Sequence, residues 1–73
     1  MELKATVQIG KKGMTEEVIE EIKAQLKKRK IVKIRFLKNA DRENFKEKVE
    51  SIAKKVGAQI VEIKGYTFIL RRE

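Results

Sequence analysis

The sequence contains no cysteine and no histidine. Thiolate and imidazole metal sites, cysteine nucleophiles and the usual general base at neutral pH are therefore excluded. The only serine, Ser51, lies inside a helical pattern with no base beside it that could activate its hydroxyl. No acid, base and nucleophile combine into a catalytic motif, so we expect no enzymatic activity, no cofactor, no metal site and no small-molecule substrate.

Long apolar runs are also missing. No segment approaches the roughly 20 apolar residues of a membrane span, and the chain opens on Met1-Glu2-Leu3-Lys4 rather than on a secretion signal. We therefore expect a cytoplasmic protein with no membrane partner. With 73 residues the chain suits a single domain, residues 1–73, with a small and shallow core.

Positive charge is in surplus, because 19 Lys and Arg against 11 Asp and Glu give a net charge of +8. The surplus lies in residues 22–42, which hold nine basic residues and one acidic residue. A nucleic-acid partner explains this best, since Lys and Arg gain from counterion release when they bind phosphates. A thermophile's charged surface is the alternative, which fits the 41% of charged residues and the five Asn and Gln but needs no net charge.

Apolar periodicity predicts the order strand, helix, strand, helix, strand, strand. Thr15 is a good N-cap for the first helix, because Glu16 and Glu17 follow it where acidic groups favour the helix dipole. Asn39 or Asp41 can cap the second helix. The expected helices span 15–29 and 42–56, and the expected strands span 5–9, 31–37, 60–63 and 66–70, with Gly57 ending the second helix and Lys64-Gly65 as a tight hairpin link.

These elements predict a two-layer α/β fold with a four-stranded mixed sheet. Right-handed crossovers make the first three strands parallel, and the hairpin makes the last strand antiparallel. Both helices cover one face, so the other face stays in water and carries Lys33 and Arg35. The loops that leave the parallel strands, at 10–13, 38–42 and 64–65, share the edge of the sheet where α/β folds usually bind ligands.

The loop Gly10-Lys11-Lys12-Gly13 holds two of the four glycines in the chain. Glycine lets a backbone approach a phosphodiester and expose its N–H groups, and KH domains clamp nucleotides with a Gly-x-x-Gly loop in this way. The spacing alone is a weak signal, because a strand-to-helix turn with two solvated lysines explains it too. Glu16 and Glu17 would repel an anion from the N-terminus of the helix, so the loop amides and lysines should make the phosphate contacts.

Three segments together resemble the YhbY or CRM family (chloroplast RNA splicing and ribosome maturation). They are VQIGKKGMTE at 7–16, IVKIRF at 31–36, and GA at 57–58 followed by VEIKGYTFILRR at 61–72. The resemblance runs from about residue 5 to residue 72. It is specific because it joins the VQIGKxG loop to the late Gly-x-Thr-hydrophobic strand at the family's separation.

The resemblance implies an RNA-binding module, free-standing in bacteria and archaea, where it is associated with precursors of the large ribosomal subunit, and repeated in plant organelle splicing factors. It also implies the fold of the C-terminal domain of bacterial initiation factor three. The loop through which the family contacts RNA corresponds to Gly10, Lys11, Lys12 and Gly13. Many members have a basic helix before the first strand, where this chain has only about four residues, so contacts from such a helix are not expected.

We therefore expect a domain that binds structured RNA, with ribosomal RNA during large-subunit assembly as its partner and without base-specific readout. The loop at 10–13 makes the main contacts, and Lys38, Arg42 and Lys64 assist from the neighbouring loops. A base-stacking platform would need exposed aromatic rings on adjacent strands, for which Tyr66 is the only candidate.

A second basic edge is expected at the opposite end of the sheet. The helix dipole is a sufficient cause for lysines at helix ends, and a second RNA surface is the alternative explanation. The residues concerned are Lys27, Lys28, Arg29, Lys30, Lys54, Lys55, Arg71 and Arg72.

Two other functions stay open. A DNA-binding chromatin protein resembling Alba would share a related fold and an Ile-Gly-Lys-Lys run, but the link Lys64-Gly65 leaves no room for Alba's long arm between the last two strands. A protein-interaction module whose charge serves solubility or thermostability would bind RNA no better than any polyanion such as heparin.

Overall fold

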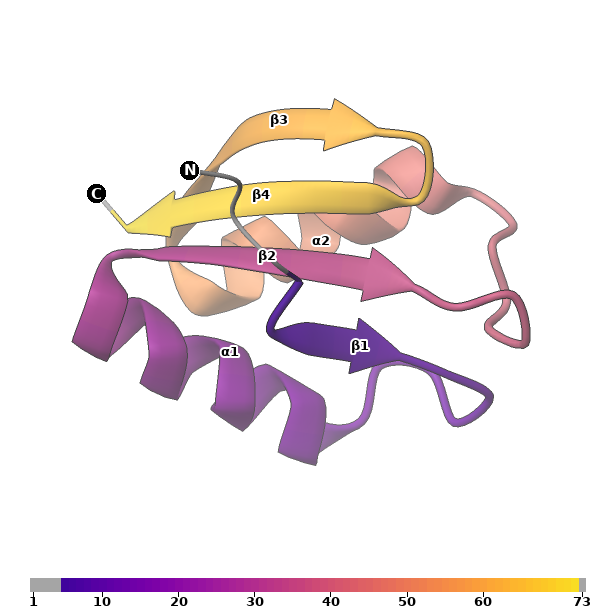
Figure 1. The fold of residues 1–73 in the computed structure, drawn as a ribbon, viewed down its shortest axis with the longest axis horizontal. Helices are drawn as coiled ribbons and strands as arrows, with labels where there is room; N and C mark the ends of the chain where they lie inside the picture. Colours follow the sequence, from indigo (N-terminus) through magenta and orange to yellow (C-terminus); the bar gives the residue numbers. More distant parts are fainter. Residues whose placement is uncertain (1–4, 73) are drawn as a thin grey trace.

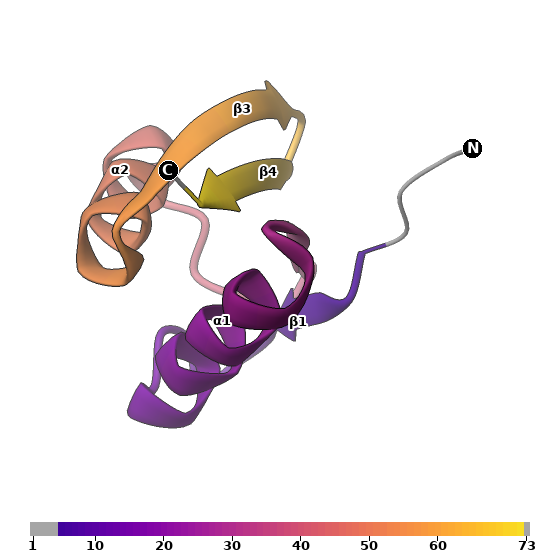
Figure 2. The same cartoon turned by 90° about the vertical axis from the view of Figure 1, so that its left-hand side faces the viewer.

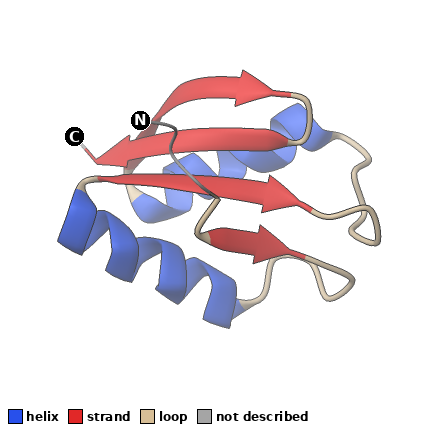
Figure 3. Ribbon diagram, in the orientation of Figure 1, coloured by secondary structure: helices blue, strands red, loops and turns tan. Residues whose placement is uncertain are grey.

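The computed structural model describes residues 5–72. The charged opening segment at 1–4 and residue 73, which the single expected domain includes, lie outside the described residues. Six elements follow one another along the chain (Figures 1 and 3). They are β1 (Val7–Ile9), α1 (Glu16–Arg29), β2 (Ile31–Phe36), α2 (Phe45–Val56), β3 (Ala58–Lys64) and β4 (Thr67–Arg72).

The four strands form one mixed sheet in the order β1-β2-β4-β3. β1 and β2 are parallel, and β4 is antiparallel to both of its neighbours, β2 and β3. The prediction of three parallel strands and an antiparallel last strand is therefore confirmed. β4 enters the sheet between β2 and β3, so the crossover through α2 skips one strand position (Figure 1).

Both helices lie on the same face of the sheet, as Figure 2 shows in side view. In β1, β2 and β4 buried side chains alternate with half-buried or exposed ones and point toward the helices, which is the two-layer arrangement expected from the periodicity. Within residues 5–72, neither α1 nor α2 has the length and apolar character of a membrane span. The core consists of Val7, Ile9, Ile22, Leu26, Val32, Ile34, Phe36, Ala40, Val49, Ile52, Ala53, Phe68 and Leu70.

The start of α1 agrees with its sequence. The hydroxyl of Thr15 accepts a hydrogen bond from the Val18 N–H at 3.2 Å, so it satisfies one of the donors left free at a helix start. Glu16 and Glu17 occupy the first turn as expected. Ile22 and Leu26 of α1 lie on the face that packs against the sheet, and both are buried.

The second helix starts later than the sequence indicated. α2 begins at Phe45 rather than at 42, and its N-cap is Asn44, which has a left-handed backbone with φ 54° and makes no capping hydrogen bond. The prediction that Asn39 or Asp41 caps this helix is wrong. Asp41 instead accepts a hydrogen bond from the Glu43 N–H, and such a local turn competes with helical geometry.

The hairpin between β3 and β4 is displaced by one residue. Lys64 pairs with Thr67, so the turn is Gly65-Tyr66 and not the predicted Lys64-Gly65. Gly65 has φ 60° at the first turn position, where a type II′ hairpin favours glycine. β3 also contains a bulge at Val61, which shifts the register between Ile60 and Glu62 and leaves Val61 54% exposed on this edge strand.

The end of α1 is strained at Lys30, whose backbone is left-handed with φ 65°. A Cβ in this conformation costs about 1–2 kcal/mol, whereas glycine loses about 0.5–1 kcal/mol more entropy on folding. We therefore expect Lys30→Gly to raise the free energy of unfolding by about 0.5–1 kcal/mol in urea titrations.

Arg29→Gly is the matched control, because it removes the same charge at the neighbouring helical residue. It should lower the free energy of unfolding by about 1 kcal/mol. Equal losses in both variants would contradict the assignment of strain to Lys30.

Candidate nucleic-acid interface

The loop after β1 is a tight turn that presents two lysines. The Gly13 N–H donates to the Gly10 carbonyl at 2.9 Å, and the turn places the exposed Lys11 and Lys12 at its tip. The Thr15 N–H then donates to the Gly13 carbonyl at 3.1 Å, which joins the turn to the cap of α1. The loop is therefore held by backbone hydrogen bonds, while its cations remain in solvent.

The two glycines of this loop have different surroundings. Gly13 has a left-handed φ of 70°, and a Cβ there would meet no atom within 4 Å. Gly10 lacks such a φ, and a Cβ there would touch Leu37 and Asn39 at ordinary distances of 3.6–3.8 Å. Of the two, Gly13 is thus the glycine that the turn requires and that leaves open space beside the backbone.

A hollow of about 410 Å³ separates this loop from α2. Lys11, Lys12 and Gly13 line one side of it, and Lys48, Ser51 and Lys55 of α2 line the other. The three α2 residues are three and four positions apart, so they share one face of the helix. Apolar groups from Met14, Phe36 and Ile52 complete the lining, and Asp41 lies there as well.

The opposite flank of the loop is acidic. A second hollow, of about 480 Å³, is lined by Lys12 and Gly13 together with Glu16 and Glu17 from the first turn of α1. The dipole of α1 favours carboxylates there, and these carboxylates repel an approaching anion. A polyanion at this loop is therefore better accommodated on the α2 flank, where the lysines lie.

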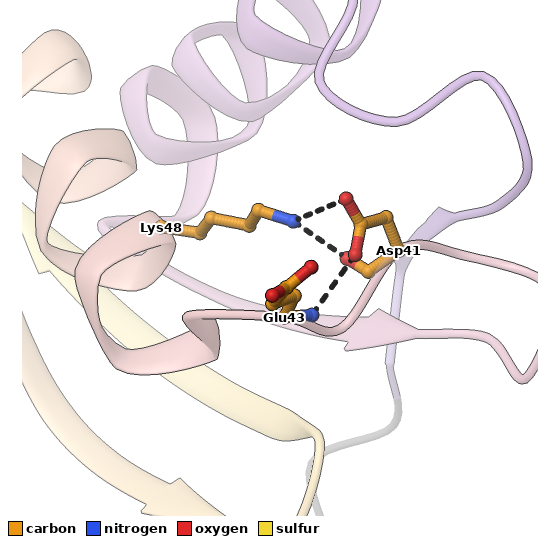
Figure 4. A network of polar contacts seen from close by, with 3 residues as sticks. All are labelled: Asp41, Glu43 and Lys48. Carbon is orange, nitrogen blue, oxygen red and sulfur yellow. Dashed lines mark hydrogen bonds and ion pairs between the residues drawn. The ribbon is translucent and has the colours of Figure 1, made fainter.

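A polar network fixes the loop between β2 and α2 (Figure 4). The ammonium of Lys48 lies 2.8 Å from the Asp41 carbonyl and 3.2 Å from its Oδ2, and the Glu43 N–H donates to Oδ1 at 3.0 Å. The hydrogen bond from Glu43, followed by the contacts of Lys48, holds the pKa of the Asp41 carboxyl below its ordinary value of 3.8. The network ties the loop at Asp41 to Lys48 of α2.

Arg42 joins the same loop to the hairpin. Its guanidinium donates to the Phe36 carbonyl at 3.0 Å and lies 4.0 Å above the centre of the Tyr66 ring. The Phe36 N–H donates to the Tyr66 carbonyl at 2.8 Å, so the end of β2 is linked to the hairpin twice. Arg42 is half-buried, and this geometry suits a structural clamp better than a mobile phosphate ligand. Contact between Arg42 and RNA stays a prediction.

The aromatic rings of the chain form one cluster beside this clamp. Phe45 lies 5.1 Å from Phe36, 5.2 Å from Tyr66 and 6.0 Å from Phe68, measured between ring centres. Tyr66 is 44% exposed, whereas Phe36 and Phe68 are buried. The rings therefore serve the core, and the sheet carries no pair of exposed aromatics for stacking bases.

The loops predicted to bind a ligand do meet at one edge. The Leu37 N–H donates to the Ile9 carbonyl at 2.8 Å, which brings the loop after β2 beside the loop at 10–13. Lys38 is exposed in that second loop, and Lys64 is exposed at the end of β3. The three parallel strands all end at this edge, as their orientation required.

Sequence reasoning missed the α2 face of the hollow. The sequence places Lys55 at the opposite basic edge and assigns Ser51 no binding role, whereas both residues line this hollow. The spacing of Lys48, Ser51 and Lys55 on α2 was a usable signal, but only the packing shows that this face turns toward the loop at 10–13. At the opposite end, the Arg72 N–H donates to the Lys30 carbonyl at 2.8 Å, so the ends of α1 and β4 meet there as expected.

The Arg42 clamp gives a stability prediction. Arg42→Ala removes a charge-assisted hydrogen bond and a cation–π contact, so the free energy of unfolding should fall by about 1–3 kcal/mol. Lys38→Ala removes a charge from the same loop at an exposed side chain and should change it by less than about 0.5 kcal/mol. Urea unfolding compares the two, and equal effects would show that the clamp adds nothing.

The Asp41 network gives a pH prediction. Because its pKa is lowered in the folded state, the carboxylate stabilises the protein above pH 3.8, and this contribution is lost as the pH falls through the lowered pKa. Asp41→Asn keeps the acceptor for the Glu43 N–H and removes the charge. It should be less stable than wild type at pH 7, and the difference should vanish at pH values below the folded pKa.

Glu43→Gln is the control, since it removes an exposed carboxylate next to the network. Urea midpoints measured across the acid range should show no comparable pH-dependent difference for it. A difference for Asp41→Asn that persists at the lowest pH would rule out the charge as its cause.

Comparison with known proteins agrees with these features. A solved structure of a hypothetical protein from Staphylococcus aureus, described as a candidate RNA-binding protein, superposes with a TM-score of 0.80 and 28% sequence identity. The match covers 97% of this chain and 73% of the other. The sequence profile of the CRS1/YhbY (CRM) domain matches residues 1–72. This match spans nearly the whole chain, and the chain belongs to the CRS1/YhbY (CRM) domain family.

Proposed function

We propose that this protein binds structured RNA without catalysing a reaction, and that its partner is ribosomal RNA during assembly of the large subunit in the cytoplasm. The observation that carries the proposal is the loop at 10–13, which holds Lys11 and Lys12 in solvent across a hollow from the lysine face of α2. Phosphates can bind these ammonium groups and the backbone amides of the loop.

Family membership supports RNA as the ligand. The CRS1/YhbY (CRM) domain is the family whose resemblance implied an RNA-binding module, and the similar Staphylococcus aureus protein is described as a candidate RNA-binding protein. Ribosomal RNA is proposed because the resemblance implies that free-standing members are associated with precursors of the large ribosomal subunit. The net charge of +8 fits any phosphate-rich partner and does not distinguish ribosomal RNA from other RNA.

The hairpin argues against a DNA-binding protein of the Alba type. Gly65 and Tyr66 are the only residues between the paired ends of β3 and β4, so no long arm extends from the sheet there. Lys38 and Lys64 are exposed at the same edge and extend the basic surface, while Arg42 positions it. Backbone contacts of this kind carry no base-specific readout.

The test compares Lys11→Ala/Lys12→Ala with Lys28→Ala/Arg29→Ala, which removes the same charge at the opposite end. Affinity for ribosomal RNA fragments, duplex DNA and heparin is measured by fluorescence anisotropy across a salt series. The Lys11→Ala/Lys12→Ala variant should bind RNA at least about tenfold more weakly, and its log–log salt slope should flatten by about 0.7–0.9 per lost phosphate contact. The Lys28→Ala/Arg29→Ala variant should bind RNA nearly as well as wild type.

Wild-type protein should also bind RNA more tightly than DNA or heparin. Equal losses from both pairs on every polyanion would mean that the loop is a turn with solvated lysines. The function would then be the alternative one, a basic interaction module without a specific nucleic-acid ligand.

A further inference from the structure

The face of the sheet opposite the helices carries polar side chains from every strand. On β2, Lys33 and Arg35 alternate with buried residues, and on β4, Thr67 and Arg71 do the same. Both helices lie on the other side, and no helix or strand of residues 5–72 covers this face (Figure 2). Within the described residues this face is therefore uncovered, and it is continuous with the edge that carries the loop at 10–13.

The strand register aligns four of these side chains in one row across the sheet. Gln8 on β1 pairs with Arg35 on β2, Arg35 pairs with Thr67 on β4, and Thr67 pairs with Lys64 on β3. With about 4.8 Å between neighbouring strands, the row is about 14 Å long and runs perpendicular to the strands. We call these four residues the cross-strand row.

The cross-strand row differs from the next row on the same face. There Lys33 pairs with Ile69, and Ile69 pairs with Glu62, so that row contains an apolar and an acidic side chain. The cross-strand row contains two cations and two hydrogen-bonding groups and no acid. It also lies next to the binding edge, because Gln8 is two residues before Gly10 and Lys64 is the last residue of β3.

Protection of sheet edges does not explain the row. A lysine on the edge strand β3 can discourage strand pairing with another chain, but β2 has a partner on both sides and needs no such protection at Arg35. Within the described residues Arg35 and Lys64 are exposed, and neither forms an ion pair there. Both cations are thus available to a ligand.

We propose that the RNA strand held at the loop continues over the sheet along the cross-strand row, with Arg35 and Lys64 each contacting a phosphate. Gln8 and Thr67 can form hydrogen bonds with phosphate or ribose oxygens, including the 2′-hydroxyl. Proteins that hold single strands without reading their sequence track the backbone with a basic surface and stack bases on aromatic rings, and Tyr66 is an exposed ring at the end of this row. This inference rests on the proposed function, and it specifies the path that the bound RNA takes over the sheet.

The experiment uses a fluorescein-labelled single-stranded RNA of about 12 nucleotides, within the usual site sizes of single-strand binders, and a duplex of the same sequence. Arg35→Ala/Lys64→Ala is compared with Arg71→Ala/Arg72→Ala, which removes two exposed cations from the far end of β4. The first pair should lose at least about fivefold in affinity for the single strand and flatten the salt slope by about 1.4, and the second should change affinity less than about twofold.

Tyr66 supplies a second measurement. It is the only tyrosine of a chain without tryptophan, and it lies between Lys64 and Thr67. RNA that reaches the end of the row should therefore change the intrinsic tyrosine emission of wild-type protein, and polyphosphate without bases should not. Arg35→Ala/Lys64→Ala should lose this change even at saturating RNA.

The outcomes separate the two proposals. If the row pair and the control pair lose affinity equally, or if RNA leaves the tyrosine emission unchanged, the path over the sheet is wrong while the loop can still bind RNA. If wild-type protein binds RNA no better than heparin, the proposed function fails and the path fails with it. Stronger loss on the duplex than on the single strand would overturn the single-stranded path.

Discussion

The antiparallel pairing of β2 with β4 is the interaction on which the rest of this structure depends. It runs from Ile31 to Arg35 on β2 and places Ile34 opposite Phe68. One half of the molecule is the unit β1-α1-β2 and the other is α2-β3-β4, and this pairing joins their apolar faces into one core. Without it β2 would keep only the short parallel pairing with β1, and both faces would be exposed to water.

The same pairing forms the binding edge. It sets the end of β2 beside the hairpin, so that the Phe36 N–H reaches the Tyr66 carbonyl and Arg42 can bond the Phe36 carbonyl. Lys48 holds the Asp41 carbonyl in a similar way. Some cations of this basic chain are thus used to satisfy backbone carbonyls and hold loops in place. Others, such as Lys11 and Lys12, are exposed to solvent, where their ammonium groups can reach phosphates.

The electrostatic asymmetry of the loop at 10–13 has a structural cause. Glu16 and Glu17 lie in the first turn of α1 because the helix dipole favours them there, and they make one flank of the loop unfavourable for an anion. The other flank faces lysines on α2. A polyanion is therefore directed toward α2 rather than toward the N-terminus of α1.

Much of the fold could be predicted from local signals. The period of the apolar residues, the cap at Thr15 and the left-handed glycine at Gly57 defined the elements, because each acts within a few residues of itself. The errors arose where two local signals competed. At Asp41 the side chain closes a turn instead of capping α2, and at Gly65 the glycine takes the first turn position rather than the second, which shifts the hairpin by one residue.

The sequence by itself determined the elements, the mixed sheet, the edge at which the loops meet and the family, because these follow from periodicity, chain direction and short motifs. Only the tertiary structure decided that β4 lies between β2 and β3, that α2 turns Lys48 and Lys55 toward the loop, and that Gln8, Arg35, Thr67 and Lys64 form one row. Strand order and helix rotation are set by how distant apolar faces pack together, and no local sequence pattern encodes that choice.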